Sequence, residues 1–125
     1  MIPIRILLVE DDAAFAETVR LALTACGYEV VVASDGREAL RHYDPPTVAL
    51  VLTDLLMPDM EGVELILALR RRDVGVKIIA MSGGGTNQPD VYLRIAQQVG
   101  ALKTLAKPFP LEELQQAVKE CLAAT

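Results

Sequence analysis

The sequence has few cysteines and no long apolar run, and both absences narrow what the protein can be. Its two cysteines, Cys26 and Cys121, lie far apart and lack metal-ligand spacing. Each falls on an apolar helical stripe, so we expect buried free thiols in a reducing compartment. No apolar stretch approaches the roughly 18 residues of a membrane span. The first residues lack the charged and apolar regions of a secretory signal, which favours a cytoplasmic protein.

The chain also carries little clustered positive charge. Its 17 acidic and 12 basic residues give a net charge of −5. The basic run Arg70-Arg71-Arg72 comes at the end of a predicted helix, where cations complement the helix dipole. Without a basic stripe, direct binding to nucleic acid is not expected. The single histidine, His42, lies on a predicted helix, and an exposed surface role is favoured over that of a phosphodonor or relay histidine.

Apolar runs alternate with segments of helical period along the whole chain. The runs at 4–9 and 48–53 are almost continuously aliphatic, which is typical of strands buried on both faces of a parallel sheet. Shorter strands are predicted at 29–32, 76–81 and 102–105. Helices are predicted between them, including 61–72 and 90–99, with inward-facing stripes made by Phe15, Val19, Leu23 and Cys26 and by Val91, Ile95 and Val99.

This (βα)₅ pattern predicts an α/β fold over residues 1–125, read as one domain without an output domain. The expected architecture is a doubly wound parallel five-stranded sheet in a three-layer, flavodoxin-like sandwich. In such folds, ligands bind outside the carboxyl ends of the strands, so the residues at those ends are the candidates for chemistry.

Charged and polar residues follow four of the predicted strands. They are Glu10, Asp11 and Asp12 after the first, Asp54 after the third, Ser82 after the fourth and Lys107 after the fifth. Singly, each has an ordinary explanation: Asp12 is expected to cap a helix, and the others could be solvated loop residues. Together, the acids would repel one another unless a cation compensated them. Mg²⁺, which prefers oxygen ligands including one or two carboxylates, suits that role.

Lys107 and Ser82 indicate what such a metal site would serve. A lysine and Mg²⁺ beside one carboxylate would stabilise a transferring phosphoryl group. A hydroxyl such as that of Ser82 could donate a hydrogen bond to a phosphoryl oxygen. Asp54 would then be the nucleophile that forms an acyl phosphate.

Four segments carry these residues in a distinctive context: Ile-Leu-Leu-Val-Glu-Asp-Asp at 6–12, Asp-Leu-Leu-Met-Pro-Asp-Met-Glu-Gly at 54–62, Met-Ser-Gly at 81–83, and 100–109, which begins Gly-Ala and ends Lys-Pro-Phe. In order and approximate spacing, they resemble the receiver domains of two-component response regulators. The resemblance covers essentially all 125 residues. The resemblance is to a chemotaxis-regulator-like receiver, and it implies a stand-alone, single-domain one.

The resemblance implies a role for each site residue. Asp54 matches the phosphoacceptor, Ser82 the hydroxyl that binds the phosphoryl group, and Lys107 the family's lysine. The implied Mg²⁺ ligands are Asp11, Glu10, Asp54 and the backbone carbonyl of Leu56. The bond between Lys107 and Pro108 would be cis.

The family also implies how the domain would be used. A histidine kinase or a histidine phosphotransfer protein would supply the phosphoryl group, and a protein target would read the phosphorylated state. The domain would be a signalling switch that catalyses only its own phosphorylation and dephosphorylation. A monomer, or a weak dimer that depends on phosphorylation, is expected.

Three features depart from the family pattern. Thr104 occupies a position where an aromatic residue is usual, so the usual inward swing of an aromatic ring is not available. Gly83 replaces the usual alanine and begins a run of three glycines. The stretch 82–100 is also longer than in common chemotaxis-type receivers, and its glycines suggest a mobile loop.

Three alternatives share parts of this pattern. A haloacid-dehalogenase-type phosphohydrolase would carry its nucleophilic aspartate after the first strand and would have a cap domain. A flavodoxin-type module would need a hydroxyl- and glycine-rich phosphate loop where Glu10, Asp11 and Asp12 stand. A receiver-like binding module that is never phosphorylated is the closest alternative, and the complete acid set with Ser82 and Lys107 argues against it.

Overall fold

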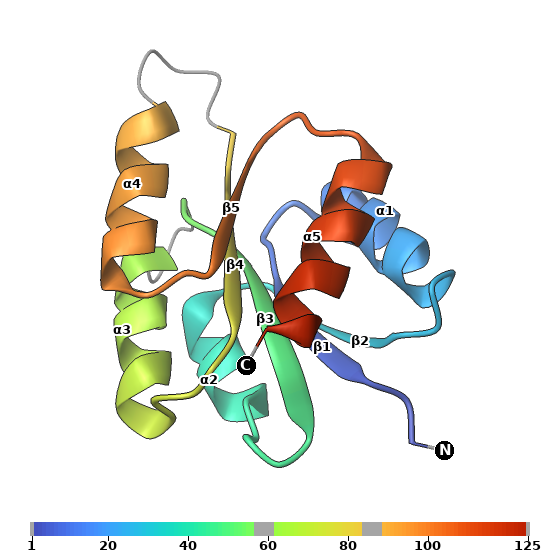
Figure 1. The fold of residues 1–125 in the computed structure, drawn as a ribbon, viewed down its shortest axis with the longest axis horizontal. Helices are drawn as coiled ribbons and strands as arrows, with labels where there is room; N and C mark the ends of the chain where they lie inside the picture. The colour runs from blue at the N-terminus through green and yellow to red at the C-terminus, as the bar shows by residue number, and fades with distance from the viewer. Residues whose placement is uncertain (1, 57–61, 84–88, 125) are drawn as a thin grey trace.

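The computed structural model describes residues 2–56, 62–83 and 89–124, and strands alternate with helices along them (Figure 1). The strands are β1 (Arg5–Val9), β2 (Glu29–Ala33), β3 (Val48–Asp54), β4 (Ile78–Ser82) and β5 (Lys103–Ala106). The helices are α1 (Ala13–Thr24), α2 (Gly36–His42), α3 (Gly62–Arg72), α4 (Pro89–Val99) and α5 (Leu111–Ala123).

The five strands form one parallel sheet in the order β2-β1-β3-β4-β5. The chain therefore winds outward in one direction from β1 to β2 and in the other from β3 to β5. Ligand crevices of such sheets lie at the carboxyl ends of the strands, where the winding reverses. Here that point falls between β1 and β3.

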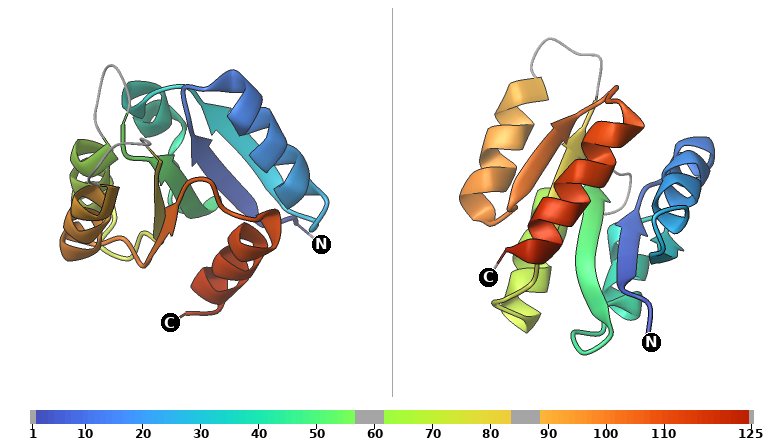
Figure 2. Two further views of the ribbon diagram at one scale, coloured as in Figure 1. Left: turned by 90° about the horizontal axis from the view of Figure 1, so that it is seen from above. Right: turned by 45° about the vertical axis from the view of Figure 1, so that its right-hand side comes forward.

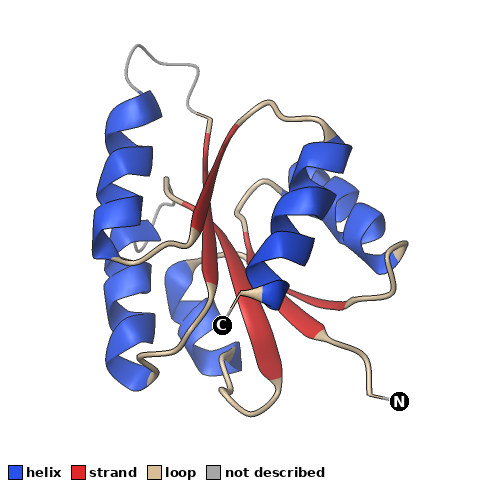
Figure 3. Cartoon of the chain, viewed as in Figure 1, coloured by secondary structure: helices blue, strands red, loops and turns tan. Residues whose placement is uncertain are grey.

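Helices cover both faces of the sheet. The colouring in Figure 3 shows the strands as a central layer, with α1 and α5 on one side and α2, α3 and α4 on the other. The two further views in Figure 2 keep α3 beside α4. Each face has its own apolar core: Leu7, Val51 and Ile78 contribute to the α2–α4 side, and Ile6, Leu52 and Ile79 to the α1–α5 side. Alternate residues of each strand thus point to opposite cores, as the pleat requires.

Local signals start and stop the helices next to the site. The carboxylate of Asp12 accepts hydrogen bonds from the N–H groups of Ala14 and Phe15, both at 3.1 Å, and so caps α1 as predicted. Gly27, just beyond that helix, has a φ of +93°, which suits glycine better than other residues. These signals fix α1 directly after the acidic segment that follows β1.

The predicted fold is confirmed, but some side chains that were predicted to face the core are exposed. Cys26 is exposed, because α1 ends before it and its stripe does not continue, whereas Cys121 is buried. On α4, Val91 is 38% and Ile95 is 37% exposed. Ala96 is buried instead, and Leu93 and Val99 pack beside it.

The described part of the chain contains no helix long and apolar enough to span a membrane. His42, at the end of α2, is exposed as predicted.

Candidate functional site

The carboxyl ends of β1 and β3 border a hollow with acidic walls. Glu10 directly follows β1, and Asp54 is the last residue of β3. Because these strands are hydrogen-bonded neighbours, two acids that are far apart in the sequence come together. The hollow is lined by Glu10, Asp12, Asp54, Leu56, Gly83 and Lys107. It lies where a doubly wound sheet is expected to bind its ligand.

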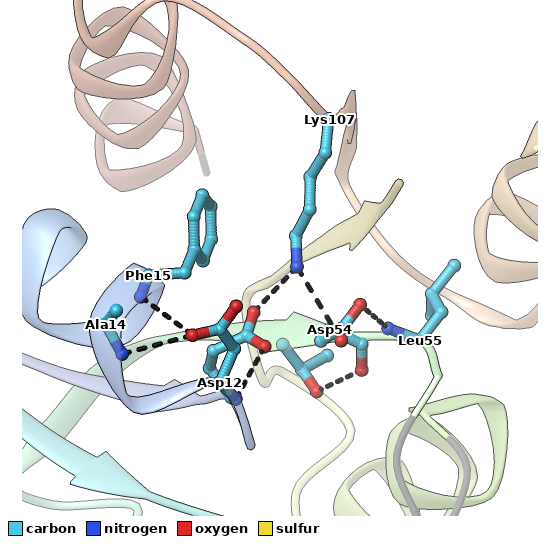
Figure 4. A network of polar contacts seen from close by, with 8 residues as sticks. Asp12, Ala14, Phe15, Asp54, Leu55 and Lys107 are labelled. Atoms are coloured by element: carbon cyan, nitrogen blue, oxygen red, sulfur yellow. Dashed lines mark hydrogen bonds and ion pairs between the residues drawn. The ribbon is translucent and has the colours of Figure 1, made fainter. Parts of the chain in front are cut away.

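Lys107 bridges the two buried acids. Its Nζ lies 2.8 Å from Oε1 of Glu10 and 3.7 Å from Oδ2 of Asp54 (Figure 4). The lysine follows β5, and its backbone N–H donates a hydrogen bond of 2.8 Å to the carbonyl of Ser82. The ammonium group therefore pairs closely with Glu10 and acts on Asp54 from a longer distance.

Asp54 is a buried carboxylate with incomplete compensation. Only 6% of the residue is exposed, and its Oδ1 accepts a 2.9 Å hydrogen bond from the N–H of Leu55. Burial raises the pKa of Asp54, and the charge of Lys107 and the backbone N–H groups of Leu56 and Leu55 offset that effect only in part. An additional cation in the hollow would stabilise the ionised form.

Glu10 is in the same situation. It is 2% exposed, and burial raises its pKa, as does the negative charge of Asp54. The hydrogen bonds from Lys107 and from the N–H of Asp12 act in the opposite direction. Two neighbouring acids whose pKa values are both raised mark this edge of the sheet as a candidate functional site.

Ser82 brings a buried hydroxyl to the same edge. The residue is 1% exposed, and its Oγ has no hydrogen-bond partner among the residues that the structure describes. In the register of β3 and β4, Met81 pairs with Asp54, so Ser82 continues one residue further towards the carboxyl edge. A buried hydroxyl without a partner is unfavourable, and an acceptor atom on a ligand would satisfy it.

Three of the acids can provide oxygen ligands to one cation. Glu10, Asp11 and Asp54 each offer a carboxylate oxygen, and these oxygens all lie within 4.8 Å of one another. Oxygen-only donor sets suit hard divalent cations such as Mg²⁺. The residues present therefore fit the expected metal. Leu56 lines the hollow, and the role of its carbonyl remains a prediction.

Phe15 makes a contact that the sequence did not predict. We expected this residue to lie in the core, but it is only partly buried, and the Nζ of Lys107 lies 4.3 Å from the centroid of its ring. The ring also packs edge-on against Phe109, with centroids 5.9 Å apart and an interplanar angle of 81°. The contact joins α1 to the segment after β5, so the apolar pattern of α1 alone could not predict it.

The segment around Lys107 has a cis peptide bond and packs closely against Gly83. The bond between Lys107 and Pro108 is cis, as the resemblance implied. At Gly83, an added Cβ would lie 2.2 Å from the Cβ of Lys107, so a side chain there would displace one of the two segments. Glycine at this position therefore matches the close packing of the lysine stem.

Some predicted motif positions lie outside the described residues. These are 57–61, within the segment that follows Asp54, and 84–88, which includes Gly84 and Gly85 of the glycine run.

Comparison with known proteins identifies the family. The family model described as the response regulator receiver domain matches residues 6–119, which span the hollow and all but the ends of the chain. The chain belongs to this family. The parallel five-stranded sheet with its five helices is the fold of receiver domains that resemble the chemotaxis protein CheY.

Individual relatives support the assignment. The chain is 37% identical over 124 residues to the response regulator MprA of Mycolicibacterium vanbaalenii, covering 98% of this chain and 52% of that protein. It is 35% identical over 120 residues to the transcriptional regulatory protein GlrR of Escherichia coli, covering 96% of this chain and 26% of that one. The receiver thus spans only about a quarter to a half of these curated relatives.

A solved structure matches over its whole length. It is a putative response regulator from Chloroflexus aurantiacus, 31% identical, with a TM-score of 0.87 over 98% of this chain and 100% of that chain.

Proposed function

We propose that this receiver domain accepts a phosphoryl group on Asp54 in a Mg²⁺-dependent reaction and passes the signal to a protein partner. The observation that carries the proposal is the buried Asp54 carboxylate, 3.7 Å from the Lys107 ammonium and clustered with Glu10 and Asp11. Family membership supports it, since receivers are signalling domains of two-component systems.

The metal ligands we propose are Asp11, Glu10, Asp54 and the backbone carbonyl of Leu56. When bound, Mg²⁺ would offset negative charge on the phosphoryl group and on the acids around it. Before it binds, Lys107 is the cation that partly compensates Glu10 and Asp54.

Asp54 is the proposed nucleophile. One of its carboxylate oxygens would attack the phosphorus of a phosphohistidine on a histidine kinase or a phosphotransfer protein. The new O–P bond forms as the P–N bond breaks, and the electron pair of the P–N bond returns to the imidazole nitrogen. Lys107 and the unpaired hydroxyl of Ser82 would then hold the phosphoryl oxygens.

Water would later attack the phosphorus of the acyl phosphate, which breaks the O–P bond, releases inorganic phosphate and restores the Asp54 carboxylate. The domain would thus act on no separate substrate. This activity differs from that of a phosphohydrolase, whose substrate is another molecule.

Output would arise from a population shift in the segment after β4, in α4 and in β5. Thr104 lies on β5, opposite Ala80 in the register with β4, and is only partly buried. Because a threonine cannot make the ring movement of an aromatic residue, we propose that this receiver uses the backbone of these segments for its readout. The readers would be proteins rather than nucleic acid, and we propose a cytoplasmic monomer or a weak phosphorylation-dependent dimer.

The test is incubation with acetyl phosphate, with and without Mg²⁺, followed by intact-mass measurement. The expected result is a mass increase of one phosphoryl group that requires Mg²⁺ and is lost in Asp54→Asn. Glu64→Gln, which changes an exposed acid on α3, is the matched control and should be phosphorylated normally. Failure with acetyl phosphate and with partner kinases would instead support a binding module that is never phosphorylated.

A further inference from the structure

Phe15 contacts the cation of the site, although no motif of the sequence assigns it a function. Its ring lies beneath the Lys107 ammonium, with 4.3 Å between Nζ and the ring centroid. A cation at this distance from a ring face is attracted by the ring quadrupole. The contact places an uncharged side chain of α1 against the ammonium of Lys107, which lines the hollow.

The ring is held in place from two directions. The backbone N–H of Phe15 donates a 3.1 Å hydrogen bond to the Asp12 cap, which fixes the first turn of α1. The edge-on contact with Phe109 fixes the plane of the ring. Both supports are local to the site, so the ring presents a fixed face to the ammonium.

The position of this ring face favours pairing of the Lys107 ammonium with Glu10 over pairing with Asp54. Phe15 and Asp54 lie on opposite sides of the Lys107 ammonium (Figure 4). The ammonium lies 2.8 Å from Glu10 but 3.7 Å from Asp54. Movement of the ammonium towards Asp54 would carry it away from the ring, so the cation–π contact supports the pairing with Glu10.

That pairing occupies a candidate metal ligand. One oxygen of Glu10 accepts the hydrogen bond from Lys107, and the other accepts a 3.2 Å bond from the N–H of Asp12. Each oxygen keeps a second lone pair, so a cation can still coordinate Glu10, but it would then lie close to one of these partners. Because Lys107 is itself a cation, it is the partner that a divalent ion would repel.

We propose that Phe15 is a positioning residue that holds Lys107 against Glu10 and so weakens Mg²⁺ binding by the Glu10, Asp11 and Asp54 cluster. The inference rests on the proposed function for its metal. Phe15 would set the Mg²⁺ concentration at which the site becomes ready for phosphorylation.

The experiment measures the Mg²⁺ dissociation constant by isothermal titration calorimetry at fixed ionic strength. Phe15→Leu removes the ring face and should tighten Mg²⁺ binding about two- to fivefold, the size of a partly exposed cation–π contact. Phe15→Tyr keeps the ring face and should bind Mg²⁺ with the affinity of the original protein. Leu21→Ala, at an exposed position of the same helix, is the control and should leave it unchanged.

A double-mutant comparison separates positioning from packing. In a Lys107→Met background there is no ammonium to hold, so adding Phe15→Leu should leave the Mg²⁺ affinity unchanged. If Phe15→Leu has the same effect with and without Lys107, the residue acts through packing and the proposal is wrong. Unchanged or weaker Mg²⁺ binding in the single variant would also overturn it.

A second measurement does not use the metal. In NMR spectra of the Mg²⁺-free protein, the ring current of Phe15 should shift the Lys107 Cε protons, and Phe15→Leu should abolish that shift. A protein that shows the shift but binds no Mg²⁺ would refute the metal-dependent function. Mg²⁺ binding that is equal in all Phe15 variants would refute this inference alone.

Discussion

Two buried acids share one lysine at the carboxyl edge of the sheet, and this arrangement lowers the stability of the folded protein. Glu10 and Asp54 are both almost fully buried, and burial raises the pKa of each. Lys107 pairs closely with Glu10 alone. The charge of Asp54 therefore remains partly uncompensated until a cation or a phosphoryl-bound metal neutralises it. The buried charge of Asp54 thus destabilises the folded protein, but it leaves a carboxylate ready to bind a cation and to react.

Asp54→Asn should stabilise the metal-free protein by roughly 1–2 kcal/mol at neutral pH, since it removes a buried charge that is poorly compensated. The pKa of Asp54 is raised above its ordinary value of 3.8. In the pH window between these two pKa values, the folded state therefore binds more protons than the unfolded state. Stability due to this group therefore falls as pH rises through the window. The gain from Asn should be full above the raised pKa and vanish below about pH 3.8.

Urea denaturation of both proteins at several pH values checks this, with Glu64→Gln as the exposed control. An Asn variant that is less stable at neutral pH, or equally stabilised at all pH values, would contradict the assignment of the cost to the ionised carboxyl.

Ser82→Ala should slow phosphorylation by acetyl phosphate roughly 10–100-fold, the worth of one hydrogen bond to a charged group. The free energy of unfolding should not fall, because the Ser82 hydroxyl has no partner among the described residues to lose. The rate is measured by intact mass over time, and Ser34→Ala, at an exposed position, is the control. An unchanged rate would remove Ser82 from the site.

Among the elements, α5 is held on the sheet by its apolar face and by contacts at its C-terminus. Its buried residues pack on the same core as β1 and β4. At its C-terminus, the ammonium of Lys77 donates hydrogen bonds to the carbonyls of Leu122, at 3.1 Å, and Ala124, at 2.6 Å. A cation at this end also complements the helix dipole. The helix α5, which follows the Lys107 segment, is thus held by a lysine that directly precedes β4, at the amino end of that strand.

Lys77→Met should destabilise the protein by about 1–2 kcal/mol, because it leaves the last carbonyls of α5 without their cation. Lys119→Met, at an exposed position of α5, is the matched control and should cost little. Thermal or urea denaturation measures both. Equal effects of the two substitutions would show that the capping contacts contribute nothing.

The elements were largely predictable, and so was the meeting of the acids with Lys107. Continuous apolar runs identified the strands, and parallel winding places their carboxyl ends at one edge. The orientation of α4 was not predictable, since apolar residues occupy more than one of its faces, and Val91 and Ile95 turned out exposed. The contact of Phe15 with Lys107 depends on how α1 packs against the segment after β5, which no local pattern reveals.

For the whole molecule, Mg²⁺ binding should be linked to folding. A cation that binds only the folded acid cluster stabilises the protein by about 2.7 kcal/mol when its concentration is one hundred times the dissociation constant. We expect Mg²⁺ to raise the midpoint of thermal unfolding, and to do so much less in Asp54→Asn. Equal shifts in both proteins would place the metal elsewhere.

The central claim is that the phosphoryl group resides on the carboxylate of Asp54, and borohydride trapping tests it most directly. Reduction of an aspartyl phosphate converts that aspartate to homoserine, which peptide mass spectrometry locates. After treatment with acetyl phosphate and Mg²⁺, we predict homoserine at position 54 and none when Mg²⁺ is omitted. Homoserine at another aspartate, or none at all in a protein that gains phosphoryl mass, would contradict the account.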